Sequence, residues 1–471
     1  MTAAKKKVDF TSGRILPKII AFALPIILTN LLQMLYNAAD LMVISLSDEP
    51  NGVGAVGMSS STVNLIVNIF IGFSVGSNVV IARHIGAKDK DAAQRATHTA
   101  LLLALIFGVF AGALGILTAR PLLKLLGTPD PIMDLAVTYI TVYCLGVPFV
   151  SITNFLVSIF RAKGDSKTPL IILSISGLIN VALNLLFVLA FGLSAEGVAL
   201  ATAIANIVSS VILLIKLMKS DEYTAFKFKS LKLDKRSVRE ILYIGFPSAI
   251  QGSLISITNM VIASSIATLD KMLTPDPALT PVLNGNAAQG NLDSFVFVGM
   301  DAITVSIISF TGQNMGANKP ERIKKSLHIG ILLTSVVGIC MALTVYLLRT
   351  PLLSLYGIVN GAPGSADALA FNIAQTRIYF VTLPYFLCGI MNVCTGTLRG
   401  MGKALSSFII TLFGLGILRI LWTALIFPLN MTIENLLIGY PLTWIPSAIV
   451  AYIIARIFIR RKLKVTKEIN I

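Results

Sequence analysis

The chain has 471 residues, of which 55% are hydrophobic and only 13% are charged, and its formal net charge is +16. Soluble globular chains carry about 25% charged residues, and the apolar residues here form repeated blocks long enough to cross a bilayer. The composition therefore predicts an all-α polytopic membrane protein and argues against a soluble enzyme or a soluble binding module.

Twelve apolar segments follow one another along the chain, and about 20 helical residues suffice for one crossing. The first and seventh segments are longer than a straight crossing, so we expect them to tilt or to bend at Pro25 and Pro247. The basic start "MTAAKKKVDF" lacks the apolar core of a cleavable signal peptide. The predicted spans are 15–46, 52–80, 95–118, 132–160, 168–191, 196–218, 238–268, 291–312, 325–348, 370–397, 404–428 and 434–459.

Lysine and arginine are distributed unequally between the two sides of these spans. About 32 lie in the loops of one side and about four on the other, and such a bias marks the basic side as cytoplasmic. Both termini are therefore predicted to be cytoplasmic. The positive charge sets the topology and contacts anionic lipid, so no nucleic-acid partner is expected. The residues on the opposite side are Arg120, Lys124, Lys271 and Arg349.

One long cytoplasmic connection divides the twelve spans six and six. Its alternating basic and apolar residues, "KSDEYTAFKFKSLKLDKRSVRE", indicate an extended or surface-lying linker. The predicted organisation is an N-terminal lobe at 1–218, a linker at 219–237 and a C-terminal lobe at 238–471.

The two predicted lobes repeat one another. Gly86 corresponds to Gly316 and His98 to His328, and "RAKG" at 161–164 echoes "RGMG" at 399–402. Six spans per lobe make a parallel repeat, in which the lobes are related by an axis along the membrane normal and transport proceeds by alternating access. We interpret the paired histidines as structural. The four cysteines have no metal-ligand spacing and are interpreted as packing residues.

The first span contains one acid, in "LLQMLYNAADLMVISL", and Asp40 is the only charged residue between Ile19 and Leu46. A carboxyl group at this depth costs a few kcal/mol, and such residues mark ion pathways. Burial disfavours the charged form of an acid, so this group can carry a proton across or bind Na⁺ when ionised. The alternative is an Asp that only bridges neighbouring helices.

These motifs together resemble the MATE (multidrug and toxic compound extrusion) family over roughly residues 14 to 460. The resemblance rests on "GRILPKIIAFALPIILTNLLQMLYNAADLMVI", "VIARHIGA", "GQNMGANKPERI" and "GLINVALNLLF". It implies two six-helix lobes in a V around a central cavity, in the cytoplasmic membrane of a prokaryote. It also implies export of cationic, amphipathic compounds in exchange for H⁺ or Na⁺, with the acid at Asp40 as the first-lobe ion site.

The neighbours expected for Asp40 are amides and a tyrosine. Asn180 and Asn184 are four residues apart, so they share one helix face and can hydrogen-bond a protonated acid or ligate Na⁺. Tyr36 and Asn37 lie one turn before Asp40. An interhelical hydrogen bond made only for packing is the alternative for the asparagine pair.

The second lobe contains Asp301 at mid-membrane depth and Arg419 within the eleventh span. Asp301 is interpreted as a second coupling site, as a counter-charge for a cationic substrate, or as a structural partner of Arg419 or of backbone groups. Arg377 is expected to reach the interface. The Glu and Asp pair of the sodium-coupled branch of the family is missing here, which favours H⁺ over Na⁺.

Three functions compete for this architecture. A cation-coupled exporter is favoured over a lipid-linked precursor flippase, because a flippase needs a basic cavity and these spans hold two acids and one deep Arg. An enzyme is not expected, since no metal, nucleophile or Walker motif is present. We expect a monomer with membrane lipid and a small-molecule substrate as partners, and no cofactor. The candidate substrate-cavity residues are Gln33, Asn64, Asn68, Gln251, Met260 and Phe297.

Overall fold

The computed structural model describes residues 8–47, 49, 51–125, 127–219, 223–274, 276 and 279–469, and these contain helices and no strands. Twelve helices are long and apolar enough to cross a membrane, which confirms the predicted number of spans and the all-α class. Their outward faces carry large apolar side chains such as Phe110, Leu117 and Leu178, as a protein surrounded by lipid requires.

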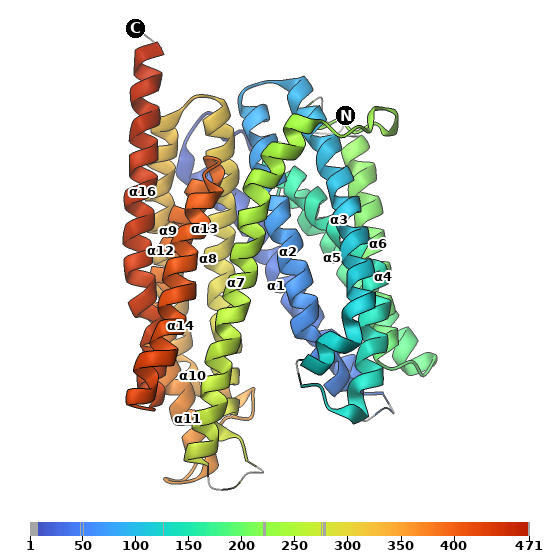
Figure 1. Ribbon diagram of the computed structural model, residues 1–471, viewed down its shortest axis with the longest axis vertical. Helices are drawn as coiled ribbons and strands as arrows, with labels where there is room; N and C mark the ends of the chain where they lie inside the picture. The colour runs from blue at the N-terminus through green and yellow to red at the C-terminus, as the bar shows by residue number, and fades with distance from the viewer. Residues whose placement is uncertain are drawn as a thin grey trace. The chain divides into compact units, whose positions relative to one another are not determined.

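The chain forms two compact units, and unit 1 comprises the residues up to Gly13, Ala21–Ile250 and Gly312–Asn318. Within it, α4 packs against α2, α3 and α6, and α6 also packs against α5 (Figure 1). The shared core includes Phe70, Ile140 and Val198. Its elements are α1 (Ile15–Ile44), α2 (Gly52–Gly86), α3 (Lys90–Leu125), α4 (Asp130–Ala162), α5 (Lys167–Leu185), the π-helical turn η1 (Leu186–Ala190), α6 (Ala195–Met218), η2 (Phe228–Ser230) and the first part of α7 (Lys235–Leu273).

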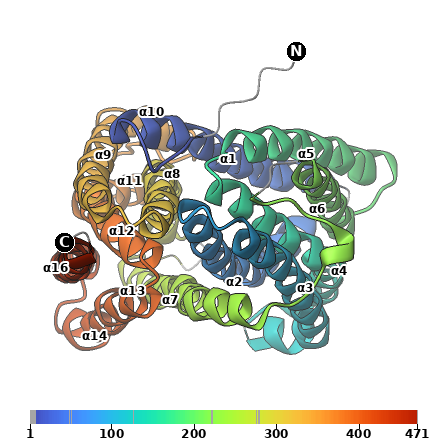
Figure 2. The ribbon, with the colours of Figure 1, turned by 90° about the horizontal axis from the view of Figure 1, so that it is seen from above.

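Unit 2 comprises Arg14–Ile20, Gln251–Thr311 and Lys319–Ile471. Its α12 packs against both α9 and α16, and α8, α9 and α12 lie side by side in Figure 2. The elements that follow α7 are α8 (Pro281–Gly316), α9 (Pro320–Leu347), α10 (Arg349–Ser354), α11 (Ala366–Arg377), η3 (Ile378–Thr382), α12 (Tyr385–Gly400), α13 (Ala404–Thr411), η4 (Leu412–Leu418), α14 (Arg419–Leu421), η5 (Trp422–Ile426), η6 (Phe427–Leu429), α15 (Ile433–Leu437) and α16 (Gly439–Ile469).

The tenth and eleventh spans are interrupted by π-helical segments, which the hydropathy pattern does not reveal. Segment η3 precedes Pro384, whose ring removes a backbone donor from the helix. Segments η4 and η5 flank the single turn α14, which carries Arg419. Because π-helical turns change which side chains share a face and often occur at functional sites, this part of unit 2 is a candidate functional region.

The repeat-equivalent glycines are sites of close backbone approach. A Cβ on Gly86 would lie 1.9 Å from the carbonyl oxygen of Gln313, and one on Gly316 would lie 1.8 Å from the carbonyl oxygen of Arg83. The ends of α2 and α8 therefore pack backbone to backbone inside unit 1. The same end holds Phe10, whose N–H donates to Gln313 Oε1 at 3.2 Å.

The linker that follows α6 is docked on α3. The buried ring of Phe226 stacks on His98 with centroids 5.1 Å apart, and the Lys227 N–H donates to His98 Nε2 at 3.1 Å. His328 in unit 2 places its Nε2 3.3 Å from the hydroxyl of Tyr452. Each histidine thus ties its helix to a later segment of its own unit, which supports the structural interpretation of this pair.

Candidate functional site

Asp40 lies on α1 beside the face of α5 that carries the two predicted asparagines. The Nδ2 group of Asn184 donates to Asp40 Oδ1, and Asn184 is fully buried while Asp40 is half-buried. The structure therefore brings Asp40 and Asn184 together. Asn184 Oδ1 has no hydrogen-bond partner among the described residues, so one amide acceptor remains beside the carboxyl group.

Asn180 also hydrogen-bonds Asp40, in the amide orientation that satisfies both Asp40 and Thr202. With the nitrogen toward Asp40, it donates to Oδ1 at 2.9 Å, and its oxygen accepts from Thr202 Oγ1 at 3.2 Å and from the Thr202 N–H at 3.3 Å. The opposite orientation would leave the amide oxygen facing the carboxylate, so we adopt the first. Two amide N–H groups then converge on one carboxyl oxygen.

Tyr36 joins α1 to α5 without bonding Asp40. Its hydroxyl donates to the carbonyl oxygen of Ser174 at 3.0 Å. Its ring lies over Gly177, where a Cβ would be 1.8 Å from the ring atom Cε2. The predicted tyrosine is thus a contact that sets the spacing of the two helices that hold the acid and the amides.

Sequence reasoning missed three neighbours of the Asp40 site. Thr202 on α6 orients Asn180, and the buried Tyr139 and Tyr143 on α4 lie within electrostatic range of Asp40. A threonine and two tyrosines that lie 99 to 162 residues after an acid have no recognisable spacing relative to it. Only the packing of α1, α4, α5 and α6 places them together.

Other predicted first-lobe residues do not contact Asp40. Gln33, Asn37 and Asn64 are exposed, and Asn68 is half-buried. None of them hydrogen-bonds Asp40 within the described part of the chain. As substrate-cavity candidates they remain predictions.

Unit 2 contains a second buried polar cluster, built around Asp293 on α8. Asp293 Oδ2 accepts from Arg377 Nε at 2.8 Å, and Oδ1 accepts from Thr382 Oγ1 at 2.6 Å and from Gln289 Nε2 at 3.3 Å. Arg377 Nη1 also donates to Asn286 Oδ1 at 2.7 Å. The expectation that Arg377 extends to the interface is wrong, because a buried carboxylate binds it instead.

Arg419 occupies the same part of unit 2. Its Nη2 donates to Thr443 Oγ1 at 3.0 Å, and its guanidinium lies 4.3 Å from the ring centroid of Tyr440. Asp301 interacts electrostatically with Arg399. The coupling-site and counter-charge roles of Asp301 stay predictions.

The remaining second-lobe candidates differ in their surroundings. Gln251 is buried with both ends of its amide engaged, since Nε2 donates to Thr411 Oγ1 at 2.9 Å and Oε1 accepts from Ser407 Oγ at 3.1 Å. Phe297 stacks on Tyr385 at 6.1 Å, and Met260 is exposed. Gln251 thus serves a helix contact in this structure, whereas the side chain of Met260 has an open surface.

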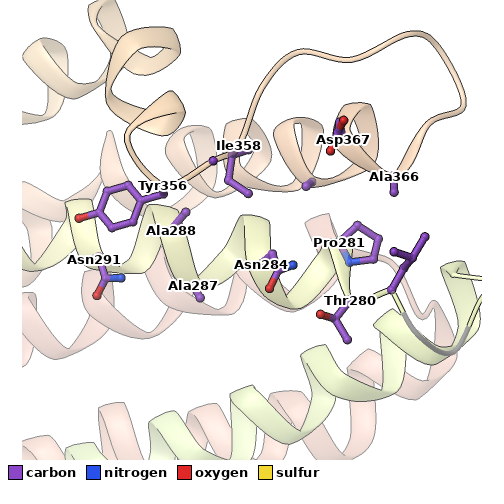
Figure 3. A pocket seen from close by; sticks show the side chains of 13 residues that line it. Thr280, Pro281, Asn284, Ala287, Ala288, Asn291, Tyr356, Ile358, Ala366 and Asp367 are labelled. Carbon is purple, nitrogen blue, oxygen red and sulfur yellow. The ribbon is translucent and has the colours of Figure 1, made fainter. Parts of the chain in front are cut away.

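A cavity of about 440 Å³ lies in unit 2 at the N-terminal end of α8. Figure 3 shows Asn284 and Asn291 of α8 on one side of it and Tyr356 and Asp367 on the other. None of the predicted site residues lines it. It is distinct from both buried polar clusters.

Comparison with known proteins shows the family of this chain. The MatE family model matches residues 25–186 and 280–425. The chain belongs to the MatE family. A solved multidrug resistance MATE family transporter of the MOP superfamily, in an outward-facing conformation, aligns with a TM-score of 0.87 at 21% identity over 98% of this chain and 100% of that one.

Two curated proteins have sequences similar to this chain over nearly its whole length. The probable multidrug resistance protein YoeA of Bacillus subtilis is 25% identical over 95% of each chain. A protein described as an FAD transporter from Shewanella oneidensis is also 25% identical, over 94% of each chain. The chain is therefore a multi-pass membrane protein of a transporter family.

Proposed function

We propose that this protein is a secondary active exporter of organic, mainly cationic compounds, in the cytoplasmic membrane of a prokaryote, with Asp40 as its coupling-ion site. The observation that carries the proposal is the half-buried carboxyl group of Asp40, held by amides of α5 within a membrane helix that has no other charge between Ile19 and Leu46. YoeA, whose description is a probable multidrug resistance protein, supports drug-like substrates.

The coupling ion that best suits this geometry is H⁺. Sodium needs several oxygen ligands, whereas Asn180 and Asn184 both direct amide nitrogen toward Asp40 Oδ1. Binding Na⁺ at this oxygen would require both amides to turn. Protonation requires only that Asp40 Oδ2 accept a proton, and the two donors then hold the carboxyl group in place.

An ion gradient supplies enough energy for this export. Each charge moved through 100 mV contributes about 2.3 kcal/mol, and each unit of ΔpH contributes about 1.4 kcal/mol. Exchange of one proton for one monovalent cation moves no net charge, so each unit of ΔpH then supports about tenfold accumulation of substrate on the outer side.

The test uses purified protein in liposomes with a fluorescent organic cation such as ethidium. We expect transport under an imposed ΔpH and none under ΔNa⁺ alone, and we expect D40N to insert and fold but to lose transport completely. Asp91 lies exposed in the first turn of α3, so D91N is the matched acid-to-amide control and should transport like the wild type. Near-normal transport by D40N would refute the assignment of Asp40, and transport under ΔNa⁺ alone would refute H⁺ coupling.

A lipid-linked precursor flippase is the alternative function for this fold. It would predict flipping of a labelled polyprenyl-diphosphate lipid and no ethidium transport under either gradient. The exporter is preferred because relatives of this chain, YoeA among them, are described as probable multidrug resistance proteins.

A further inference from the structure

Each unit carries a buried polar centre, and the two centres differ in charge. The centre in unit 1 has one carboxyl group, Asp40, with Tyr139 within electrostatic range of it and Thr202 bound to Asn180 beside it. The centre in unit 2 has two guanidinium groups, of Arg377 and Arg419, and one carboxylate, of Asp293.

The carboxylate of this second centre, that of Asp293, already has hydrogen-bond partners. Both oxygens of Asp293 accept hydrogen bonds, Oδ2 from Arg377 and Oδ1 from Thr382 and Gln289. Arg377 and Arg419 lie within electrostatic range of one another, and both guanidinium groups lie over the ring of Tyr440, at 5.7 and 4.3 Å. One positive charge in the centre is thus left without a carboxylate partner among the described residues, which is costly in a buried site.

The positive charge without a carboxylate partner is that of Arg419. The groups around its guanidinium indicate where an anionic ligand would bind. The aromatic rings of Tyr440 and Trp444 lie 4.3 and 5.9 Å from the guanidinium. Its side chain is 5% exposed, and Nε has no hydrogen-bond partner within the described part of the chain. A guanidinium binds a carboxylate through two parallel N–H groups on one edge, and here Thr443 occupies only Nη2.

We propose that the second polar centre, formed by Arg419 with Tyr440, Thr443 and Trp444, binds an anionic group, namely the carboxylate or phosphate of a transported compound. The inference rests on the proposed export function and extends its substrate class to zwitterions and organic anions. The aromatic residues supply a surface for the apolar part of such a compound, and Arg419 supplies the two donors for its acidic group.

The test measures equilibrium binding to detergent-solubilised full-length protein by fluorescence polarisation. The two probes are a zwitterionic rhodamine carboxylic acid and its methyl ester, which share the same cationic ring system. We expect R419Q to bind the acid at least about tenfold more weakly than the wild type, as loss of a charge-assisted pair implies, and to bind the ester unchanged. R419K should be intermediate, because Lys keeps the charge and loses the two-point contact.

R349Q is the matched charge-removal control. Arg349 lies at the start of α10, where Nη1 donates to the carbonyl oxygen of Tyr346, and its replacement should leave the affinity for both probes unchanged. If R419Q weakens the binding of the acid probe and of the ester probe equally, Arg419 serves only the packing of the lobe and the proposal is wrong. Unchanged acid binding by an R419Q protein that melts like the wild type would overturn it equally.

An inorganic anion such as chloride is the other ligand that the Arg419 centre could bind. Titration of chloride into gluconate buffer should displace the acid probe from the wild type and have no effect on its binding to R419Q. If chloride stabilises the wild type but never competes with the acid, the centre binds an inorganic ion only and the substrate proposal fails. Because binding is measured without a gradient, failure of proton-coupled export would not change these outcomes.

Discussion

At the scale of single residues, the Asp40 site depends on how closely α1 approaches α5. Gly177 permits this approach because it has no side chain where the ring of Tyr36 lies. The hydroxyl of that ring bonds the backbone of α5, and Asp40 follows one turn later on α1. The spacing that lets Asn184 reach the carboxyl group is therefore set by a glycine and a tyrosine that do not touch it.

Replacing Gly177 by alanine should destabilise unit 1. The added Cβ would lie 1.8 Å from Tyr36 Cε2, and overpacking of this kind costs about 1–3 kcal/mol. We expect a lower melting temperature for G177A in detergent and partial recovery in the double variant G177A/Y36A, whose effects should be non-additive. A Cβ on Gly57 of α2 would meet no atom within 4 Å, so G57A is the control and should not be destabilised. A wild-type melting temperature for G177A would show that the two helices are not held this closely.

At the scale of elements, the linker and the start of α7 are held on the end of α3 by two polar contacts. The backbone N–H of Lys227 donates to His98 Nε2, and the backbone N–H of Asp234 donates to Thr99 Oγ1 at 3.1 Å. Asp234 also caps α7, since Oδ2 accepts from the N–H and the hydroxyl of Ser237 at 2.8 and 2.7 Å. The linker is thus a docked segment rather than a loose tether.

The cap at Asp234 predicts a pH-dependent contribution to stability. The hydrogen bonds from Ser237 lower the pKa of Asp234 in the folded chain, so the stabilisation is present above the pKa of the unfolded chain and is lost as the pH falls through the lower folded value. We expect D234A to cost about 1 kcal/mol at neutral pH and progressively less in acid. D234N keeps an N-cap side chain and should lose much less stability at neutral pH. Equal melting temperatures of D234A and wild type at neutral pH would refute the cap.

The contact between His98 and the linker predicts a local change only. Without the imidazole, the Lys227 N–H loses its acceptor and Phe226 loses its stacking partner. H98A should therefore exchange amide hydrogens faster in residues 223–230, and exchange in α5 and α6 should stay as in the wild type. Protection of the linker in H98A equal to that of the wild type would show that other contacts hold it.

At the scale of the whole molecule, the distribution of basic residues predicts the orientation in the membrane. The linker and both termini belong to the basic side, and the segment between α10 and α11 belongs to the other. A membrane-impermeant maleimide applied to intact cells should label A362C and should label S230C only after permeabilisation. Both positions are exposed in the structure, and the native cysteines lie within the spans. Labelling in the reverse pattern would invert the topology.

The sequence by itself determined the twelve spans, the internal repeat, the position of Asp40 and the shared helix face of Asn180 and Asn184. These depend on hydropathy, charge and the turn of one helix, all of which are local properties. Asp293 escaped prediction because it lies at the boundary of a predicted span, and Arg377 was misplaced because its partner is 84 residues away.

Only the tertiary structure decided which polar residues meet. Tyr139 and Tyr143 of α4 lie within electrostatic range of Asp40, and Thr202 meets Asn180 because α6 packs against α5. Arg419 meets Tyr440 because α14 packs against α16. A buried charge must find its partner across helices, since its own helix satisfies only its own backbone. Contacts of that kind depend on helix packing angles and distances, which no periodicity within one helix encodes.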